Sequence, residues 1–204
     1  MKIALIGATG LVGSRVLNEA LERGHHVTAI ARNTASIASR PGATPVSLDV
    51  VGHGERLAQV LAGQDAVVVS VKFSDVAIGP LLEAVRSAKV PRVLVVGGAG
   101  SLRVAPGIDL VDTPAFPAPY KAEALAARDA LGLLRSDQTL DWTLISPSAL
   151  LQPGERTGHY RIGADELLVD ATGASRISIE DLAQALVNEL EQPAHRRSRF
   201  TVGY

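Results

Sequence analysis

Three evenly spaced glycines near the start of the chain constrain its fold more than any other feature. Gly7, Gly10 and Gly13 follow a short apolar run at residues 3–6. Apolar side chains then recur at helical spacing: Val12, Val16, Leu17, Ala20 and Leu21. This order predicts a buried strand, a tight turn and an amphipathic helix. Gly24 follows the periodic segment and is expected to end that helix.

A strand and a helix joined by such a turn can hold the pyrophosphate of a dinucleotide. Gly7 would let the chain leave the strand sharply, Gly10 would let backbone approach the phosphates, and Gly13 would let the helix pack close to the sheet. The helix N-terminus would present free N–H groups to the anion. The predicted contacts from this turn are Gly7, Thr9, Gly10, Leu11, Val12 and Gly13. The spacing is Gly-x-x-Gly-x-x-Gly, so a purely connecting glycine turn is the alternative.

Length, charge and composition narrow the class of protein. The chain has 204 residues, is 47% hydrophobic and carries a formal net charge of −1, so no electrostatic argument favours nucleic acid or an anionic membrane. It has no cysteine, which excludes disulfides and cysteine nucleophiles, and its scattered histidines predict no metal site. No signal-peptide pattern or membrane-length apolar run is evident. We expect a soluble, cytoplasmic monomer or homodimer.

Apolar strands alternate with helical segments along most of the chain. Further strands are predicted at residues 27–31, 45–48, 66–71, 92–96, 140–145 and 199–202, and helices at 34–39, 55–61, 80–88, 120–135 and from the N-cap Ser178 onward. This alternation predicts one α/β domain over residues 1–204 with a doubly wound parallel sheet. Residues 149–175 break the pattern with short β-like pieces at 159–162 and 166–169, which predicts a small substrate-facing extension.

Residues that follow the predicted strands would meet the ligand, because it lies at the carboxyl ends of the strands in such folds. Arg32 stands where an acid would bind the ribose hydroxyls of NAD. Arginine matches a 2′-phosphate, so NADP is expected and NAD is possible, unless Arg32 is only a solvated surface residue. Asp49 follows the third predicted strand and would accept a hydrogen bond from the adenine amino group, although it equally suits a helix cap or a turn, and Val50 beside it is a further predicted cofactor contact. The remaining predicted cofactor contacts are Ser70, Val71, Lys72, Gly97, Gly98, Ala99, Pro147 and Ser148.

Three side chains are candidates for catalysis. Ser101 follows the fifth strand, and its hydroxyl would orient a substrate carbonyl or ring nitrogen, unless it is an incidental loop serine. The proline-rich segment 103–119 reads as an active-site loop, and Tyr120 and Lys121 open the next helix, facing either the site or solvent. The chain has no Gly-x-Ser-x-Gly elbow of a hydrolase. Nicotinamide chemistry is what remains.

Motifs along nearly the whole chain resemble one family. The matching blocks are Gly-Ala-Thr-Gly-Leu-Val-Gly at residues 7–13, Ala-Arg at 31–32, Val-Val-Gly-Gly-Ala-Gly-Ser at 95–101, and the segments 141–147, 156–163 and 177–183. Together they look like the atypical short-chain dehydrogenases/reductases, specifically the NADH-flavin reductase group, which is related to NmrA-like proteins and biliverdin reductase B. The resemblance implies a Rossmann fold, NAD(P) binding and reduction of flavins or similar planar acceptors.

One family pattern is missing, the Tyr-x-x-x-Lys pair of short-chain dehydrogenases. Lys121 follows Tyr120 directly, and Ala124 stands where the paired lysine would be. We expect an NAD(P)H-dependent reductase that passes hydride to a planar acceptor, with flavin as a substrate because 3% aromatic residues leave few rings to hold it tightly. An NmrA-like sensor that binds NADP(H) and acts through a protein partner is the main alternative. The absence of the Tyr-x-x-x-Lys pair counts against an epimerase or dehydratase of nucleotide sugars.

Overall fold

The computed structural model describes residues 1–37 and 40–204, and its centre is a largely parallel sheet. Within these residues the strand order is β10-β12-β8-β5-β4-β1-β2-β3, and only β10 runs antiparallel to its neighbour. The bounds of these strands are β1 Lys2–Ile6, β2 His26–Ala31, β3 Ala43–Ser47, β4 Ala66–Val69, β5 Val93–Val96, β8 Trp142–Pro147, β10 Arg161–Gly163 and β12 Ser198–Gly203. The chain builds outward from β1 in one direction and then from β4 in the other. The predicted doubly wound Rossmann sheet is confirmed.

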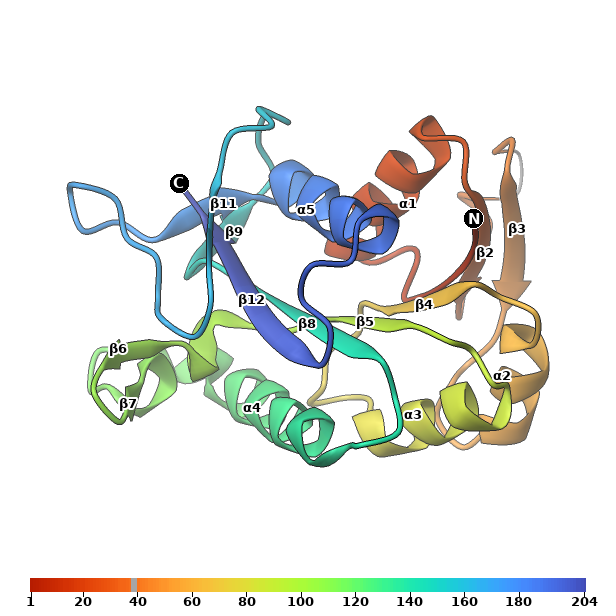
Figure 1. The fold of residues 1–204 in the computed structure, drawn as a ribbon, viewed down its shortest axis with the longest axis horizontal. Helices are drawn as coiled ribbons and strands as arrows, with labels where there is room; N and C mark the ends of the chain where they lie inside the picture. The colour runs from red at the N-terminus through yellow and green to blue at the C-terminus, as the bar shows by residue number, and fades with distance from the viewer. Residues whose placement is uncertain (38–39) are drawn as a thin grey trace.

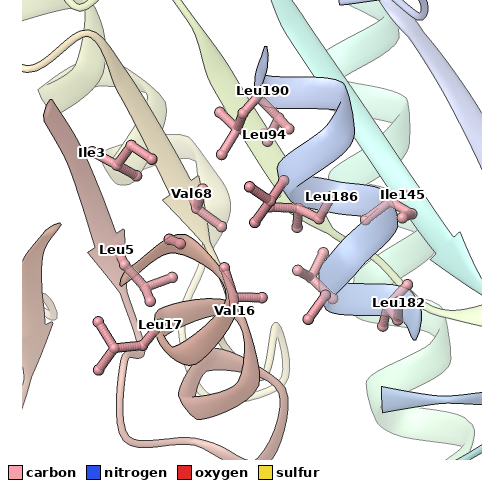
Figure 2. Packing of buried hydrophobic residues seen from close by; sticks show 14 of the residues in the cluster. Ile3, Leu5, Val16, Leu17, Val68, Leu94, Ile145, Leu182, Leu186 and Leu190 are labelled. Carbon is pink, nitrogen blue, oxygen red and sulfur yellow. The ribbon is translucent and has the colours of Figure 1, made fainter. Parts of the chain in front are cut away.

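Helices cover both faces of the sheet (Figure 1). On one face lie α1 (Leu11–Glu22) and α5 (Ile179–Glu191); on the other lie α2 (Gly54–Leu61), α3 (Ile78–Ser87) and α4 (Lys121–Ser136). The central strands β4 and β5 are buried along their whole length, which explains their continuous runs of valine and leucine. The side chains of successive strand residues point alternately into the two cores on opposite faces of the sheet. Figure 2 shows the core under α1 and α5. Over the described residues, no helix has the length and apolar character needed to cross a membrane.

The local signals at two helix ends are confirmed. Gly24 follows α1 with φ +77°, and the N–H groups of Gly24 and His25 donate to the carbonyls of Leu21 and Ala20 at 2.9 and 3.0 Å. This is a Schellman ending, in which a left-handed glycine lets the chain satisfy the last helical carbonyls. At the start of α5, the Ser178 hydroxyl accepts the N–H of Asp181 at 3.0 Å, as expected for an N-cap.

Several predicted elements are wrong or displaced. Residues 34–37 form a turn closed by Ile37 N–H to Thr34 O at 2.9 Å instead of starting a helix, and the rest of that prediction, 38–39, lies outside the described residues. The segment 166–169 is no strand, because its backbone pairs only with Arg103, which donates to Asp165 O. The predicted piece at 159–162 appears as β10, displaced toward 163.

The proline-rich segment 103–119 is more ordered than a plain loop. It contains a two-stranded hairpin, β6 (Arg103–Ala105) and β7 (Ile108–Asp109), followed by the 3-10 turn η2 (Leu110–Asp112). The 3-10 turn η3 (Ala118–Tyr120) then leads into α4, and η1 (Ala99–Ser101) precedes the segment. These short elements lack the long apolar periodicity that predicts helices and strands from sequence.

Candidate functional site

A cleft of about 660 Å³ opens at the carboxyl ends of the central strands, in the size range of ligand pockets. The turns that follow β1, β2, β3, β4 and β5 all contribute to its wall. Most of the predicted cofactor contacts line it: Gly7, Thr9, Gly10, Leu11, Val12, Arg32, Asp49, Val50, Ser70, Val71, Lys72 and Gly97. The topology therefore gathers residues from separate strands at the switch point between β1 and β4.

The glycine turn after β1 is too tight for any other residue at two of its positions. Gly7 has φ +85°, and a Cβ there would lie 2.0 Å from the carbonyl oxygen of Ser70. A Cβ at Gly13 would lie 2.1 Å from the carbonyl oxygen of Gly7, so α1 packs directly on the turn. Gly10 is less restricted, because its Cβ would lie 3.3 Å from that same oxygen. The turn thus brings bare backbone to the cleft.

The N-terminus of α1 faces the cleft with its first N–H groups uncapped. Gly10 is the N-cap residue, no side chain of the described residues caps the helix, and its first turn holds no acidic residue. The first N–H groups of a helix lack intrahelical partners and carry the positive end of the helix dipole. This end of α1 therefore suits a phosphate, and the residues present fit the pyrophosphate of a dinucleotide.

The β2–β3 end of the cleft carries an arginine. Arg32 follows β2 and is exposed, and within the described residues its guanidinium forms no hydrogen bond or ion pair. The Ser47 hydroxyl donates to the Arg32 carbonyl at 2.9 Å, which ties β3 to this corner. Asp49 accepts the N–H of Val51 at 3.1 Å, so it forms the turn expected as its alternative and also lines the cleft.

Gly97 lines the β4–β5 end of the cleft. A Cβ at Gly97 would lie 2.6 Å from Leu144 Cδ2, so a larger residue there would require the buried Leu144 side chain to shift. The carboxylate of Glu123, from the first turn of α4, accepts the N–H groups of Phe73 and Ser74 at 2.9 and 2.8 Å and thereby fixes the chain after β4. Sequence reasoning missed Glu123 in this cleft. Its place in a first helical turn was visible, but its reach to residues 73–74 was not.

Other predicted residues lie outside the cleft lining. Gly13 packs behind the turn, and Gly98, Ala99, Pro147 and Ser148 do not reach the cleft wall. The buried Ser148 hydroxyl donates to the Val202 carbonyl at 2.9 Å. Their roles as cofactor contacts stay predictions.

The three candidate catalytic residues are also outside the lining. Ser101 belongs to a separate pocket of about 290 Å³, where Nη1 of the buried Arg199 donates to its hydroxyl at 2.9 Å. Tyr120 is 67% exposed, and Lys121 is exposed at the start of α4. The structure therefore does not bring these three side chains together at the cleft, and their catalytic roles remain predictions.

The segment 149–175 contributes one side chain to the cleft. It begins with β9 (Leu150–Gln152), which pairs in parallel with β11 (Arg176–Ser178), and Leu151 from β9 lines the cleft. Neither strand was predicted, because each is only three residues long. The segment is a small appendage that joins the cleft from the α5 side.

Carboxylates on α1 and α5 hold the middle of this appendage in place. Arg156 Nε donates to Glu19 Oε2 at 2.7 Å, Gly154 N–H to Glu180 at 2.8 Å, and the Thr157 hydroxyl to Asp181 at 2.6 Å. The Arg156 hydrogen bond lowers the pKa of Glu19 despite its burial. Burial alone would raise the pKa of Asp181, but its hydrogen bonds, including that from Thr157, lower it. These contacts keep the appendage against the edge of the cleft.

The family is shown by comparison with known proteins. A family model described as NAD(P)H-binding matches residues 7–193, beginning at the first glycine of the turn. The chain belongs to this NAD(P)H-binding family.

Solved structures with similar sequences have the same fold over the whole chain. A putative exported protein from Burkholderia pseudomallei is 48% identical, with 100% of both chains covered and a TM-score of 0.90. A putative epimerase from Bacteroides thetaiotaomicron is 42% identical, with 100% of this chain and 96% of that chain covered and a TM-score of 0.93. A putative NADH-flavin reductase from Streptococcus pneumoniae is 34% identical, with coverage of 100% and 99% and a TM-score of 0.83. The family resemblance seen in the sequence motifs is confirmed.

Proposed function

We propose that this protein is an NADPH-dependent reductase that passes a hydride to a planar acceptor, with a flavin as the first candidate. The observation that carries the proposal is one continuous cleft that joins Arg32, the uncapped N-terminus of α1 and Gly97. When bound, NADPH supplies a hydride from C4 of its nicotinamide. The chain's own part is to hold the cofactor and orient an acceptor beside it.

The preference for NADPH rests on Arg32. The end of β2 offers a guanidinium and no carboxylate, and a guanidinium binds a phosphate through two parallel hydrogen bonds. An acid here would instead favour the free ribose hydroxyls of NADH. Because Arg32 has no partner among the described residues, it is available to a 2′-phosphate without breaking an existing ion pair.

The acceptor is proposed from the shape and polarity of the other end. Val96, Gly97 and Leu151 line the cleft there and offer an apolar surface, while the chain as a whole has only 3% aromatic residues. Such a surface suits transient stacking of a flat ring better than permanent retention of a flavin. The name of the S. pneumoniae relative supports the same acceptor class.

Two other functions are kept as alternatives. A sensor would bind NADP(H) in the same cleft and signal through a protein partner without turnover. The name of the B. thetaiotaomicron relative supports an epimerase, which would leave the cofactor unchanged after each cycle and would act on a sugar substrate. Net consumption of NADPH separates the reductase from both.

The deciding experiment follows oxidation of NADPH by the loss of its reduced-nicotinamide absorbance, with FMN, FAD and riboflavin as acceptors and NADH in parallel. Turnover with a flavin, faster from NADPH than from NADH, is the expected result. NADPH binding by fluorescence without any oxidation would contradict the reductase and favour the sensor. Tests with nucleotide sugars, read by the product sugar, cover the epimerase.

We further propose a cytoplasmic location, where a cysteine-free NADPH-dependent enzyme meets its cofactor. The B. pseudomallei relative carries the name of an exported protein, which makes location worth measuring. Fractionation of cells that produce the full chain tests it, and recovery of the chain outside the cytoplasm would contradict the proposal.

A further inference from the structure

The cleft lacks the three side chains that the sequence offered for catalysis, so another group must meet the charge that an acceptor gains. Ser101, Tyr120 and Lys121 do not line it. Among the described residues, the ionisable side chains that do are Arg32, Asp49, Lys72, Asp75 and Glu123. An ionisable side chain that stabilises this charge therefore belongs to these five.

The two cations of the set lie at opposite ends of the cleft. Arg32 follows β2 and Lys72 follows β4, and β1 lies between these strands. Adjacent strands are about 4.8 Å apart, so the two strand ends are separated by roughly 10 Å. β4 pairs with β5, and Gly97 directly after β5 lines the cleft. Lys72 is therefore the cation at the acceptor end.

The neighbouring carboxylates already have partners. Glu123 accepts the N–H groups of Phe73 and Ser74, and Asp75 accepts the Ser74 hydroxyl at 3.2 Å. Within the described residues, Lys72 forms no ion pair, and its side chain is exposed. The ammonium is thus not neutralised by an existing salt bridge.

The backbone at Lys72 is nevertheless fixed. Its carbonyl accepts the N–H groups of Asp75 and Val76 at 3.1 and 3.0 Å, which closes a turn. Glu123 holds the two residues that follow. A flexible side chain on a fixed backbone can approach an acceptor without remodelling the cleft.

We propose that the Lys72 ammonium stabilises the negative charge that forms on the planar acceptor, an inference that rests on the proposed reductase function. A flavin that gains a hydride on a ring nitrogen forms a new N–H bond. The electron pair of the broken double bond stays on the ring as an anion, which later takes a proton from solvent. A cation beside that charge lowers the barrier to its formation. Lys72 thereby supplies a charged group from the cleft lining, which Ser101, Tyr120 and Lys121 do not reach.

Turnover of three variants tests the proposal. Lys72→Met removes the charge at similar length, Lys72→Arg keeps it, and Lys2→Met removes a lysine from the opposite edge of the sheet as the control. Lys72→Met is expected to lower kcat with flavin by about 10- to 100-fold while the Kd for NADPH changes less than about threefold. Lys72→Arg should recover most of kcat, and Lys2→Met should match the wild type. Unchanged kcat in Lys72→Met, or a loss confined to NADPH affinity, would overturn the proposal.

Ligand binding without turnover supplies the second readout. Riboflavin is the probe, because it carries no phosphate, and its oxidised and two-electron-reduced forms are titrated anaerobically against the NADP⁺ complex at mildly alkaline pH, where the reduced ring is an anion. The wild type and Lys72→Arg should bind the reduced form at least about tenfold more tightly, and Lys72→Met should lose this preference. Absence of the preference in the wild type contradicts the role of Lys72. Absence of turnover with the preference intact contradicts only the proposed reductase.

Discussion

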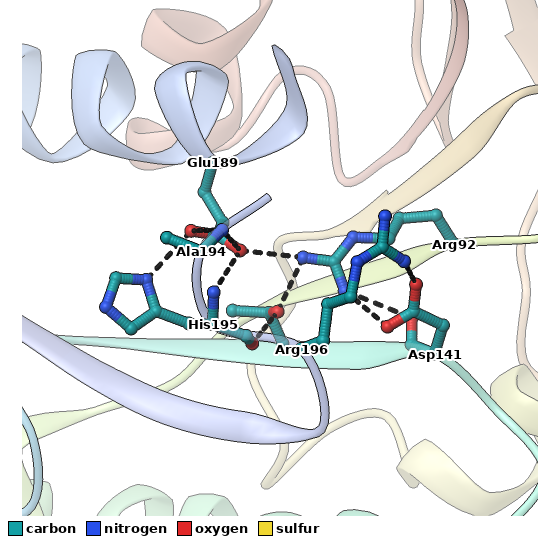
Figure 3. A network of polar contacts seen from close by, with 7 residues as sticks. Arg92, Asp141, Glu189, Ala194, His195 and Arg196 are labelled. Carbon is teal, nitrogen blue, oxygen red and sulfur yellow. Dashed lines mark hydrogen bonds and ion pairs between the residues drawn. The ribbon is translucent and has the colours of Figure 1, made fainter. Parts of the chain in front are cut away.

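The two edges of the central sheet treat their polar groups in opposite ways. At the edge where β5, β8 and β12 begin, Arg92, Asp141, Glu189 and His195 form a closed network of hydrogen bonds and ion pairs (Figure 3). At the edge where the strands end, the cleft exposes an uncapped helix and the cation Arg32, which has no ion pair among the described residues. One edge uses its polar groups internally, except for the buried Arg92 Nε, which has no hydrogen-bond partner among the described residues, and the other edge leaves its polar groups available.

The closed edge joins elements that are distant in sequence. The buried Arg92 donates to Asp141 Oδ1 and Glu189 Oε1, both at 2.8 Å, and to the Thr143 hydroxyl at 2.7 Å. Glu189 also accepts the N–H of His195 at 2.9 Å, and His195 Nδ1 lies 2.8 Å from its other oxygen. Burial lowers the pKa of Arg92, against the opposing effect of the two carboxylates. The strand starts and the end of α5 are thereby tied together.

At the open edge, similar hydrogen bonds and ion pairs would interfere with ligand binding. An acid capping α1 would neutralise the N–H groups that a phosphate needs, and an ion pair to Arg32 would compete with the ligand. Polar groups that stabilise the fold thus lie at one edge of the sheet, and polar groups that are available to a ligand lie at the other.

The largest effect is expected from breaking the closed edge. Glu189→Ala leaves Arg92 buried beside a vacancy, and removal of one partner of a buried pair costs about 3–5 kcal/mol. Urea unfolding measures the loss, and NADPH affinity of the folded variant should change less than about twofold. The control is Glu83→Ala, whose 73% exposed side chain pairs with Arg86 and should cost about 1 kcal/mol or less. Equal losses in both variants would contradict the assignment of stability to this edge.

A slightly smaller effect is expected from filling the turn at the open edge. Gly7→Ala places a Cβ 2.0 Å from the Ser70 carbonyl and keeps a positive φ, so we expect a loss of about 2–4 kcal/mol in unfolding free energy and loss of NADPH binding. Gly132→Ala is the control, since no atom lies within 4 Å of its added Cβ in α4, and it should stabilise by about 0.5–1 kcal/mol. Normal NADPH binding by Gly7→Ala would remove the turn from the site.

The open edge could be predicted from the sequence to a large extent, because its signals are local. The strand-turn-helix order around Gly7, the stop at Gly24 and the cation at Arg32 each depend on neighbouring residues. These patterns identify the secondary structure, the position of the turn and the end of each strand. Parallel pairing then brings the strand ends together. The doubly wound fold and most of the cleft lining follow from them.

The closed edge, the separate pocket at Ser101 and the place of Glu123 in the cleft could not be predicted, because their contacts are long-range. Arg92 and Glu189 are 97 residues apart, and Ser101 and Arg199 are 98 apart. Nothing in the local pattern pairs Ser101 with Arg199 instead of a substrate. Glu123 is another case, since its bonds to residues 73–74 depend on how α4 docks beside β4. Side-chain pairing across elements needs the register that only the folded structure supplies.

Removal of the Arg32 guanidinium at the open edge gives the next effect. Arg32→Ala should weaken NADPH binding by about 1–3 kcal/mol, the loss of a charge-assisted contact to the 2′-phosphate, with little change for NADH. Fluorescence titration with both nucleotides measures it, and Arg56→Ala on α2, outside the cleft lining, is the control. Equal weakening of both nucleotides would sink the 2′-phosphate assignment and leave Arg32 as a surface residue.

A third carboxylate at the closed edge gives a prediction that is read from how the unfolding free energy changes with pH. Asp137 precedes β8 and accepts the N–H groups of Thr139 and Leu140 at 2.7 and 2.9 Å and a hydrogen bond from Arg86 at 2.5 Å. Burial would raise the pKa of Asp137, but these bonds hold it well below its ordinary value of 3.8. Its stabilising contribution is therefore complete above the unfolded pKa and is lost as pH falls below that value.

Asp137→Asn tests this pH dependence. The variant lacks the titrating carboxylate, so its unfolding free energy should fall less steeply than that of the wild type as pH drops below 3.8, and the two curves should converge toward acid. Urea unfolding over a series of pH values measures both curves, and Asp129→Asn, exposed on α4, corrects for the loss of one carboxylate. Parallel curves would mean that Asp137 titrates alike in the folded and unfolded chains. The closed edge would then be stabilised by the Arg92 network without a contribution from the ionised form of Asp137.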